Sequence, residues 1–426
     1  MTAYLLNGYS AIVGAWFVIF LFATLSRRSI PTLHPLPIQN SPSELNADLP
    51  FISIIIPARN EERNIEACVS SVLAVDYPLY ELIVVDDRST DATPKIASRM
   101  AQQSNQMQFV SVTELPIGWA GKPHALHCAA QRAKGDWLLF LDADTTIHPQ
   151  NLLSAIHRVR SEELDVLSLF GGMRCETTCE RIVQPLAWVA LGLFFRLPHV
   201  NSDDHPDVAS ANGQYILISR SAYNRIGGHA AVSDQLMEDI VLAELAKKNG
   251  LRLRMASSIE LITVRMYASL GEMLRGWSRI YHGAVRHKKW KLWVLLFSTI
   301  VCSLSAYVAS FVWIGLLVAG SEFSQLATLI GWNVLHHALI VVTTAPLYRL
   351  CGGRARDLWG YLFALIVICV ALVRAIWMTF TKKIAWRGVH YSTVPSKHRA
   401  EPIGVPIPSD GISSVPSSHS PNQVAT

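Results

Sequence analysis

Two aspartates follow an apolar, strand-like run in the sequence FLDADTTIHP, which covers residues 140–149. Asp142 and Asp144 stand at positions i and i+2, so their side chains point to the same side of an extended chain. Next to a phosphate-binding cleft, two such carboxylates suit a hard divalent cation, either Mg²⁺ or Mn²⁺. Taken alone, an Asp-x-Asp sequence is more often a turn that caps the next helix. The neighbouring acidic residues therefore decide between a metal site and a turn.

Polar residues also follow the other strand-like runs. The sequence ARNEE follows the run FISIIIP (residues 51–57), and Asp86 and Asp87 end the run YELIVVDD (residues 80–87). Helix capping explains part of this second acidic cluster, but it does not explain why two acids, Asp86 and Asp87, stand side by side. A carboxylate at the end of a parallel strand can accept hydrogen bonds from the base or ribose of a nucleotide.

Glu238 and Asp239 open an amphipathic helical pattern within residues 233–250. Acids in a first turn ordinarily complement the helix dipole, whereas a carboxylate in a partly dry cleft can act as a general base that accepts a hydroxyl proton. Lys122, Arg275 and Arg279 are spaced to neutralise phosphates, although each alone fits a solvated surface charge better.

These residues belong to a pattern in which buried strands alternate with amphipathic helices. Strands are expected at 51–57, 80–87 and 136–144, and helices at 61–73 and 91–103. This alternation predicts βαβ units and a mostly parallel sheet with helices on both faces. Ligands of such sheets bind beyond the carboxyl ends of the strands, so the polar clusters that follow the strands are expected to form one site.

The 426-residue chain also carries more apolar sequence than a soluble enzyme usually does, since half of its residues are hydrophobic and its mean hydropathy is +0.27. Long apolar stretches cover residues 8–25, 292–319, 326–347 and 358–380. Each stretch reaches the roughly 20 residues that cross a bilayer. We therefore expect a multi-pass protein of the cell membrane.

Basic residues set the expected orientation. Arg27 and Arg28 follow the first apolar stretch, and RHKKWK (residues 286–291) precedes the second, so the positive-inside rule places residues 30–290 in the cytoplasm. Three further crossings would then export the basic sequence TKKIAWRGVHY, against the same rule, unless one stretch is re-entrant. Arg374, inside the last stretch, is costly in lipid unless it faces protein or water. The net charge of +5 gathers beside the apolar stretches, which indicates anionic lipid headgroups and not nucleic acid as the partner.

The expected domains follow from these patterns. They are an N-terminal transmembrane anchor (1–28), a linker (29–50), a catalytic domain (51–262), an amphipathic membrane-interface segment (263–291), about three C-terminal transmembrane helices (292–380), and a basic, then disordered, tail (381–426).

Five segments in order resemble the membrane-bound inverting glycosyltransferases of family 2. They are ISIIIPARNEERNI, ELIVVDDRSTDAT, WLLFLDADTTIHP, ANGQYILISRSAYNRIGG and MEDIVLAELAKKNG. Within that family, GWAGKPHAL, VRMYASLGEMLRGWSR and WRGVHY are similar to enzymes that act on hydrophobic terpenoid acceptors, such as hydroxychlorobactene glucosyltransferases and the hopanoid-associated group. The resemblance covers about residues 51–391 and implies a GT-A fold, an α/β architecture with a Rossmann-like sheet, flanked here by N-terminal and C-terminal transmembrane helices.

The resemblance also implies roles for individual residues. Donor-nucleotide binding falls to Pro57, Arg59, Glu61, Asp86, Asp87 and Lys122, with Asp87 on the base or ribose. Asp142 and Asp144 become the pair that binds the divalent cation on the sugar-nucleotide diphosphate, and Asp239 becomes the general base, supported by Glu238.

One segment departs from the processive members of the family. Their Q-x-x-R-W motif is matched here by LRGWSRI, which lacks the Gln and places the Trp before the second Arg. Polymer synthesis is therefore disfavoured, and Arg275, Trp277 and Arg279 are expected on the acceptor or phosphate side.

The leading hypothesis is inverting transfer of one sugar from a nucleotide-sugar donor, with a UDP-sugar expected, to the hydroxyl of a membrane lipid such as a carotenoid or other terpenoid. The alternatives are a processive polysaccharide synthase, a nucleotidyltransferase on the same sheet layout, and a non-catalytic transport or lipid-binding protein with a degenerate nucleotide domain.

Overall fold

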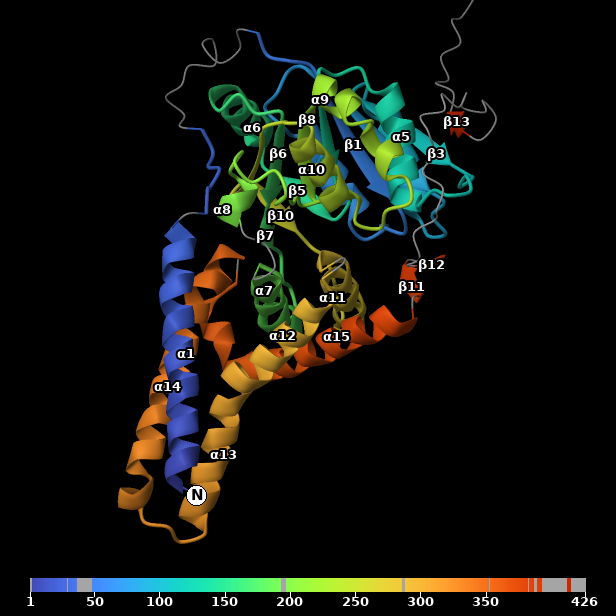
Figure 1. Ribbon diagram of the computed structural model, residues 1–426. Coiled ribbons are helices and arrows are strands. Elements are labelled where there is room, and N and C mark those ends of the chain that lie inside the picture. The colour runs from blue at the N-terminus through green and yellow to red at the C-terminus, as the bar shows by residue number, and fades with distance from the viewer. Residues whose placement is uncertain are drawn as a thin grey trace, which may run out of the picture. The chain divides into compact units, whose positions relative to one another are not determined.

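The computed structural model describes residues 2–28, 30–36, 48–192, 197–285, 288–351, 353–381, 383–386, 389–392 and 412–414 (Figure 1). The chain divides into two compact units. The first, here called the helical unit, comprises Met1–Thr32, Gly171–Pro198 and Arg265–Val394. The second, the sheet unit, comprises Leu33–Phe170, His199–Val264 and Pro395–Thr426.

The sheet unit is built on one central sheet with the strand order β13-β3-β2-β1-β4-β8-β6-β9. Its strands are β1 (Ile52–Ala58), β2 (Tyr80–Asp87), β3 (Met107–Val112), β4 (Trp137–Leu141), β6 (Val166–Phe170), β8 (Tyr215–Ser219), β9 (Leu253–Ser257) and β13 (Ile412–Ser414). The pairs β1–β2, β2–β3, β1–β4 and β6–β9 are parallel, while β8 is antiparallel to β4 and β6, and β13 is antiparallel to β3.

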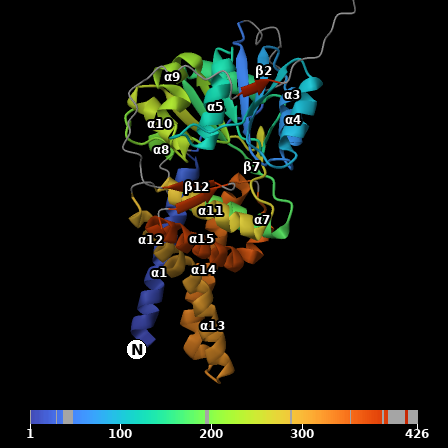
Figure 2. The ribbon, with the colours of Figure 1, turned by 90° about the vertical axis from the view of Figure 1, so that its right-hand side faces the viewer.

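Helices cover both faces of this sheet. Figure 2 shows α3 (Ile65–Leu73) and α4 (Thr93–Gln102) on one side of β2, and α5 (Gly121–Arg132) and α10 (Glu238–Lys248) on the other. The unit is completed by α6 (Asn151–Ser161), α9 (Arg220–Arg225), the 3₁₀ helix η1 (Gly228–Val232) and the antiparallel pair β5 (Thr145–Ile147) and β10 (Ile262–Val264). The predicted fold class, a mostly parallel sheet with helices on both faces, is confirmed.

The register brings the functional ends of the strands to one edge. β1 pairs with β2 from Ile52 opposite Tyr80 to Ala58 opposite Asp86, so the two strands end together. β8 runs the other way, with Leu141 at the end of β4 opposite Tyr215 at the start of β8. The residues that precede β8 therefore lie at the same edge as the residues that follow β4.

The helix that follows β1 begins later than the sequence pattern predicts. The expected start was residue 61, whereas α3 starts at Ile65. Asn60 has a left-handed backbone with φ of 54°, and the N–H groups of Glu61 and Glu62 donate to Thr93 Oγ1 at 2.8 Å and Asp91 Oδ2 at 3.1 Å. These bonds to the next loop take the place of the first helical turn.

The helical unit holds the long apolar helices. They are α1 (Thr2–Arg28), α12 (Trp290–Ser298) continued through the π-helical turn η2 (Thr299–Leu304) into α13 (Ser305–Val318), α14 (Phe323–Leu350), and the 3₁₀ helix η3 (Ala355–Gly360) continued into α15 (Tyr361–Thr381). Four segments in the described residues are long and apolar enough to cross a membrane: Leu6–Leu25, Trp290–Val318, Leu326–Arg349 and Ala355–Thr381. The expected N-terminal and C-terminal candidates for membrane helices are thus present.

Two amphipathic helices, α7 (Thr178–Gly192) and α11 (Leu270–Ala284), pack with α15 around a core that includes Trp277 and Tyr281. The unit also contains the short strand β7 (Gly172–Met173) and a hairpin of β11 (Lys383–Trp386) and β12 (Val389–Ser392). A four-residue helix, α8 (Leu197–Val200), connects the two units.

The predicted linker and tail fall largely outside the described residues. Near the start of the linker segment, the N–H of buried Leu33 donates to the carbonyl oxygen of Ser257 at 2.8 Å, so this part of the linker is attached to the sheet unit. Within the tail, residues 412–414 form β13 beside β3, which differs from the predicted disorder at these three residues. The boundaries of the predicted domains stay predictions.

Candidate active site

A half-buried ammonium group joins two of the acidic clusters. The Nζ of Lys122, in the first turn of α5, lies 2.7 Å from Asp142 Oδ1 and 2.8 Å from Glu238 Oε1. Burial alone would lower the pKa of Lys122, but the carboxylates of Asp142, Glu238 and Asp239 raise it well above its ordinary value. Lys122 is therefore a permanent cation held between the end of β4 and the start of α10.

Asp239 sits beside this cation in a different environment. Burial and the neighbouring Glu238 raise the pKa of Asp239 from 3.8 to about 7, although the charge of Lys122 opposes the shift. Its two oxygens accept hydrogen bonds from the backbone N–H groups of Gly213 at 2.9 Å and Ile240 at 2.8 Å. A half-buried carboxylate that exchanges its proton near neutrality can serve as a general base.

The connection before β8 holds the acids in place. The N–H of Asp142 donates to the carbonyl oxygen of Gln214 at 3.3 Å. A Cβ atom added at Gly213 would lie 3.1 Å from Asp239 Oδ2 and 3.2 Å from Lys122 Nζ, so a side chain there would crowd both groups. A small pocket opens at this point, and its walls include Pro57, Phe140 and His229 besides Lys122, Asp142, Gly213, Glu238 and Asp239.

Asp142 and Asp144 lie where the sequence predicts, in the turn after β4, and both are half-buried. Thr145 Oγ1 donates to Asp144 Oδ1 at 3.4 Å. Within the described residues, no group of three or more His, Cys, Asp or Glu side chains is arranged to hold a metal ion. The carboxylate oxygens of Asp142 and Asp144 fit the usual Mg²⁺ arrangement, in which one or two protein carboxylates bind the ion together with substrate phosphates.

A second charged cluster surrounds Asp87 at the end of β2. Arg59 Nη1 lies 3.3 Å from Asp87 Oδ2, and Arg88 Nε donates to Asp87 Oδ1 at 2.8 Å. A Cβ atom at Gly121 would lie only 2.2 Å from Asp87 Oδ2, so the glycine lets the start of α5 approach this carboxylate. Asp87, Arg59 and Lys122 thus lie along the same edge of the sheet.

Asp86 and Asp87, the two adjacent acids that end β2, have different surroundings in the structure. Successive residues of a strand face opposite sides of the sheet, and Asp86 accepts a hydrogen bond from the N–H of Ser89 at 3.2 Å, which closes the turn after β2. Burial raises the pKa of Asp86. Asp86 and Asp87 therefore do not face a ligand together, and the predicted nucleotide contact of Asp86 stays a prediction.

The remaining predicted residues divide between the two units. In the sheet unit, Glu61 is buried in the loop after β1, where its Oε2 accepts a hydrogen bond from Asn64 at 2.9 Å. Arg275, Trp277 and Arg279 belong to α11 in the helical unit. Trp277 is 2% exposed and packs near Trp188 and Tyr281, while Arg275 is exposed.

Sequence reasoning missed His229, a buried histidine of the pocket wall. Its Nδ1 lies 2.9 Å from the hydroxyl of Tyr223, and burial lowers its pKa to about 3, so the imidazole is neutral. Gly227 and Gly228, with φ of 79° and 54°, form the turn that leads into it. This glycine pair is the sequence signal for a special turn.

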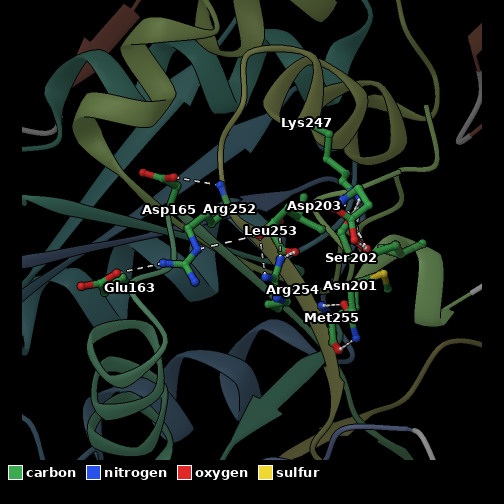
Figure 3. Close-up of polar contacts among 12 residues, drawn as sticks. Glu163, Asp165, Asn201, Ser202, Asp203, Lys247, Arg252, Leu253, Arg254 and Met255 are labelled. Carbon is green, nitrogen blue, oxygen red and sulfur yellow. Dashed lines mark hydrogen bonds and ion pairs between the residues drawn. The ribbon is translucent and has the colours of Figure 1, made fainter. Parts of the chain in front are cut away.

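The loop of residues 199–208 fixes the far end of α10 (Figure 3). Lys247 is 5% exposed, and its Nζ donates to the carbonyl oxygens of His199, Val200, Ser202 and Val208 at 3.1, 3.0, 2.6 and 3.1 Å. Asn201 exchanges hydrogen bonds with the backbone of Met255 in β9, and the carboxylate of Asp203 pairs with both terminal nitrogens of Arg254 at 2.7 and 2.9 Å.

Residues 53–226 match the family described as Glycosyl transferase family 2. The chain carries a family 2 glycosyltransferase domain. The predicted family is thereby confirmed for this domain. The match covers the residues from β1 to the end of α9, which include Asp87, Lys122 and the Asp142–Asp144 pair.

Known proteins support the same assignment of the family 2 domain. A 4,4'-diaponeurosporenoate glycosyltransferase of Staphylococcus aureus (strain USA300) is 26% identical over 242 residues, which are 55% of this chain and 62% of that relative. A solved mannosyltransferase of Pyrobaculum calidifontis, in complex with GDP-Man and Mn²⁺, matches with a TM-score of 0.51 at 17% identity. That alignment covers 87% of this chain and 99% of the mannosyltransferase, and it shows the likeness of fold.

Replacing Lys247 tests how strongly α10 is attached to the loop. Lys247→Met leaves four carbonyl oxygens without their donor, so we expect the free energy of unfolding to fall by about 2 to 3 kcal/mol. The matched control is Lys248→Met, because Lys248 is the exposed neighbour, and its effect should stay within about 0.5 kcal/mol. Chemical unfolding of the purified full chain, followed by fluorescence, measures both. Equal effects of the two substitutions would contradict the assigned role of Lys247.

Proposed function

We propose that this protein transfers one sugar, with inversion at the anomeric carbon, from a nucleotide-sugar donor to an apolar lipid acceptor. The observation that carries the proposal is the contact of Lys122 with Asp142 and Glu238, next to an Asp239 whose pKa is about 7. This arrangement combines a fixed positive charge, a metal-type carboxylate and a base within one small pocket.

The donor nucleotide is bound along the edge formed by β1 and β2. Asp87, held by Arg59 and Arg88, is positioned to accept hydrogen bonds from the base or ribose. A UDP-sugar is the donor that we propose. The Nζ of Lys122 is close enough to Asp142 to lie beside the diphosphate that these residues would bind, and its charge stabilises the anion that leaves.

Asp142 and Asp144 would hold a divalent cation together with the diphosphate oxygens. When bound, Mg²⁺ or Mn²⁺ supplies charge neutralisation of the leaving nucleoside diphosphate. The solved mannosyltransferase of similar fold contains Mn²⁺, which supports this proposal for a divalent cation. The three carboxylates around Lys122 exceed its single positive charge, so additional positive charge is electrostatically favoured at this point.

Asp239 performs the acid–base step. Its carboxylate accepts the proton of the acceptor hydroxyl, and the acceptor oxygen forms a bond to the anomeric carbon on the face opposite the diphosphate. The bond between the anomeric carbon and the phosphate oxygen breaks, and the nucleoside diphosphate departs with the electron pair. Glu238 keeps Lys122 in place beside the reacting groups through its 2.8 Å contact.

The acceptor is proposed to be a terpenoid such as a carotenoid. The relative from Staphylococcus aureus is named a 4,4'-diaponeurosporenoate glycosyltransferase, and the four apolar helices of this chain could keep the enzyme at a membrane in which apolar acceptors dissolve. By the positive-inside rule, we propose that the catalytic domain faces the cytoplasm and that the membrane is the cell membrane.

An exposed apolar turn lies on the loop that leads to Lys122. In the sheet unit, the large apolar side chains exposed among the described residues are Leu79 and Ile117, and Ile117 is 104% exposed. Gly118, with φ of 87°, and the bond from the N–H of Trp119 to the carbonyl oxygen of Pro116 at 3.1 Å shape the turn. We propose that Ile117 contacts the apolar part of the acceptor.

The acidic residues supply the first test of this function. In membranes, Asp142→Ala, Asp144→Ala and Asp239→Asn should each lower sugar transfer by about 100-fold or more, because a cation ligand or the base is lost. Transfer of radiolabelled sugar into extracted lipid measures the effect, with Lys248→Met as the control. Wild-type activity in all three variants would refute the proposal, and a polymeric product or released pyrophosphate would identify a different reaction.

The pH dependence tests the base. Asp239 must be deprotonated to act, so kcat/KM should rise with pH and reach half of its plateau near pH 7. Because Lys122 lowers the pKa of Asp239, Lys122→Met should move this midpoint to higher pH in addition to lowering the plateau. Measurements of kcat/KM with a fixed acceptor between pH 5 and 9 (about two units on either side of the pKa) would give the midpoint for the wild type and for Lys122→Met. A flat profile would exclude Asp239 as the base.

Ile117 provides a test of the acceptor contact. Ile117→Ser should raise KM for the lipid acceptor several-fold, because apolar contact area is lost, while donor hydrolysis without acceptor stays unchanged. Leu79→Ser is the matched control, since Leu79 is also exposed but precedes β2 at the opposite edge of the sheet. Identical acceptor KM values for wild type and Ile117→Ser would eliminate this contact.

A further inference from the structure

The last apolar helix has a different direction from the other three. In Figures 1 and 2, α1, α13 and α14 run alongside one another, and α15 lies across one end of this bundle. α1 and α13 both pack on α14, whereas α15 packs mainly on the amphipathic helices α11 and α7. A membrane that the bundle crosses lengthwise therefore cannot also be crossed lengthwise by α15.

The surface of α15 fits a position at the membrane boundary. One face buries small and branched apolar residues such as Ala364, Ile368, Ala371 and Ala375. The opposite face exposes an apolar stripe at alternating spacings of three and four residues: Phe363, Ile366, Val370, Val373, Trp377 and Phe380. A helix that lies in the interface presents such a stripe to the acyl chains along its whole length.

Arg374 points to the same conclusion. It is exposed and stands in the second half of α15, next to Val373 and Ala375. An arginine within a spanning helix would lie in the hydrocarbon region, which is costly. In a helix at the boundary, its long side chain reaches the lipid headgroups while its aliphatic part stays among apolar groups.

The chain beyond α15 supplies independent support. Residues 412–414 form β13, which pairs with β3 in the sheet unit from Ile412 opposite Val112 to Ser414 opposite Val110. This pairing requires the tail to be on the same side of the membrane as the catalytic domain. If α1, α12–α13 and α14 each cross once, the chain returns to the side of the catalytic domain before α15 begins, and α15 must then leave it there.

The charges agree with three crossings. Arg27, Arg28, the basic sequence of residues 286–291, Arg349, Arg354, Arg356 and the basic tail then all lie on one side. The turn between α13 and α14, residues 319–322, carries Glu322 and no Lys or Arg, and it lies on the other side. This distribution satisfies the positive-inside rule, which a fourth crossing would violate.

We propose that α15 lies in the plane of the membrane surface, with its apolar stripe against the acyl chains, and that the C-terminal tail stays on the side of the catalytic domain. The inference concerns membrane topology and holds whichever sugar or acceptor the enzyme uses.

The side of the tail is tested with the full-length chain in sealed right-side-out vesicles. Ser418→Cys in the tail, Ser104→Cys in the catalytic domain and Ser321→Cys between α13 and α14 are treated with a membrane-impermeant maleimide, and wild type gives the background from the native cysteines. We expect Ser321→Cys to react at once, and Ser418→Cys and Ser104→Cys to react after permeabilisation. Reaction of Ser418→Cys together with Ser321→Cys would overturn the proposal.

The depth of α15 is a second, independent measurement. Nitroxide labels at Phe363→Cys, Val370→Cys and Trp377→Cys, in a variant with the seven native cysteines replaced by alanine, should report one common depth in reconstituted vesicles. Labels at Phe323, Val334 and Val341 of α14, which are exposed as well, should report depths that change along the helix. A depth maximum at Val370, with shallower values at both neighbours, would show that α15 spans the bilayer.

Discussion

The candidate active site depends on one half-buried ammonium group that is shared among more carboxylates than it can neutralise. Lys122 lies 2.7 Å from Asp142 and 2.8 Å from Glu238, and its charge also acts on Asp239. Removal of the ammonium would leave acids close together in a poorly solvated pocket, which is strongly unfavourable. Burial, together with the negative charge of Glu238, raises the pKa of Asp239. The excess of negative charge that remains beside Lys122 also favours the arrival of further positive charge, as the proposed divalent cation would supply.

The fold brings these groups together through a reversal of strand direction. β4 ends at Leu141 with Asp142 beyond it, and antiparallel β8 begins at Tyr215 directly opposite. The segment before β8 therefore reaches the carboxyl edge, where the N–H of Gly213 binds Asp239. The same connection, at residues 199–208, binds Lys247 at the other end of α10. Because both ends of α10 are bound to one segment, the helix that carries Glu238 and Asp239 has little freedom to shift along its axis.

The sequence predicts the positions of the acids better than their partners. Asp142 and Asp144 follow a buried strand, so periodicity places them at the carboxyl edge of the sheet. Glu238 and Asp239 open a helix, and only the family resemblance joins them to the same site. The contact of Lys122 with two of them arises from tertiary packing at the start of α5, which no local pattern encodes. The different surroundings of Asp86 and Asp87 depend on two local features. Asp86 accepts a hydrogen bond from the N–H of Ser89, and Asp87 lies close to Gly121, where a Cβ atom would collide with its carboxylate. Hydropathy likewise finds four apolar helices, but it carries no information on their direction, and the transverse α15 is seen only in the packed helical unit.

The surroundings of the two neighbouring acids distinguish their roles. Glu238 uses an oxygen to hold Lys122, which ties the ammonium to the start of α10. Asp239 is bound by two backbone N–H groups, which stay in place whether or not it carries a proton on its remaining lone pairs. A proton can therefore pass to Asp239 without dismantling the site. Such a base is needed for a hydroxyl acceptor, whereas an acceptor carboxylate is already ionised near neutral pH. The raised pKa of Asp239 thus agrees with the proposal that a hydroxyl group receives the sugar.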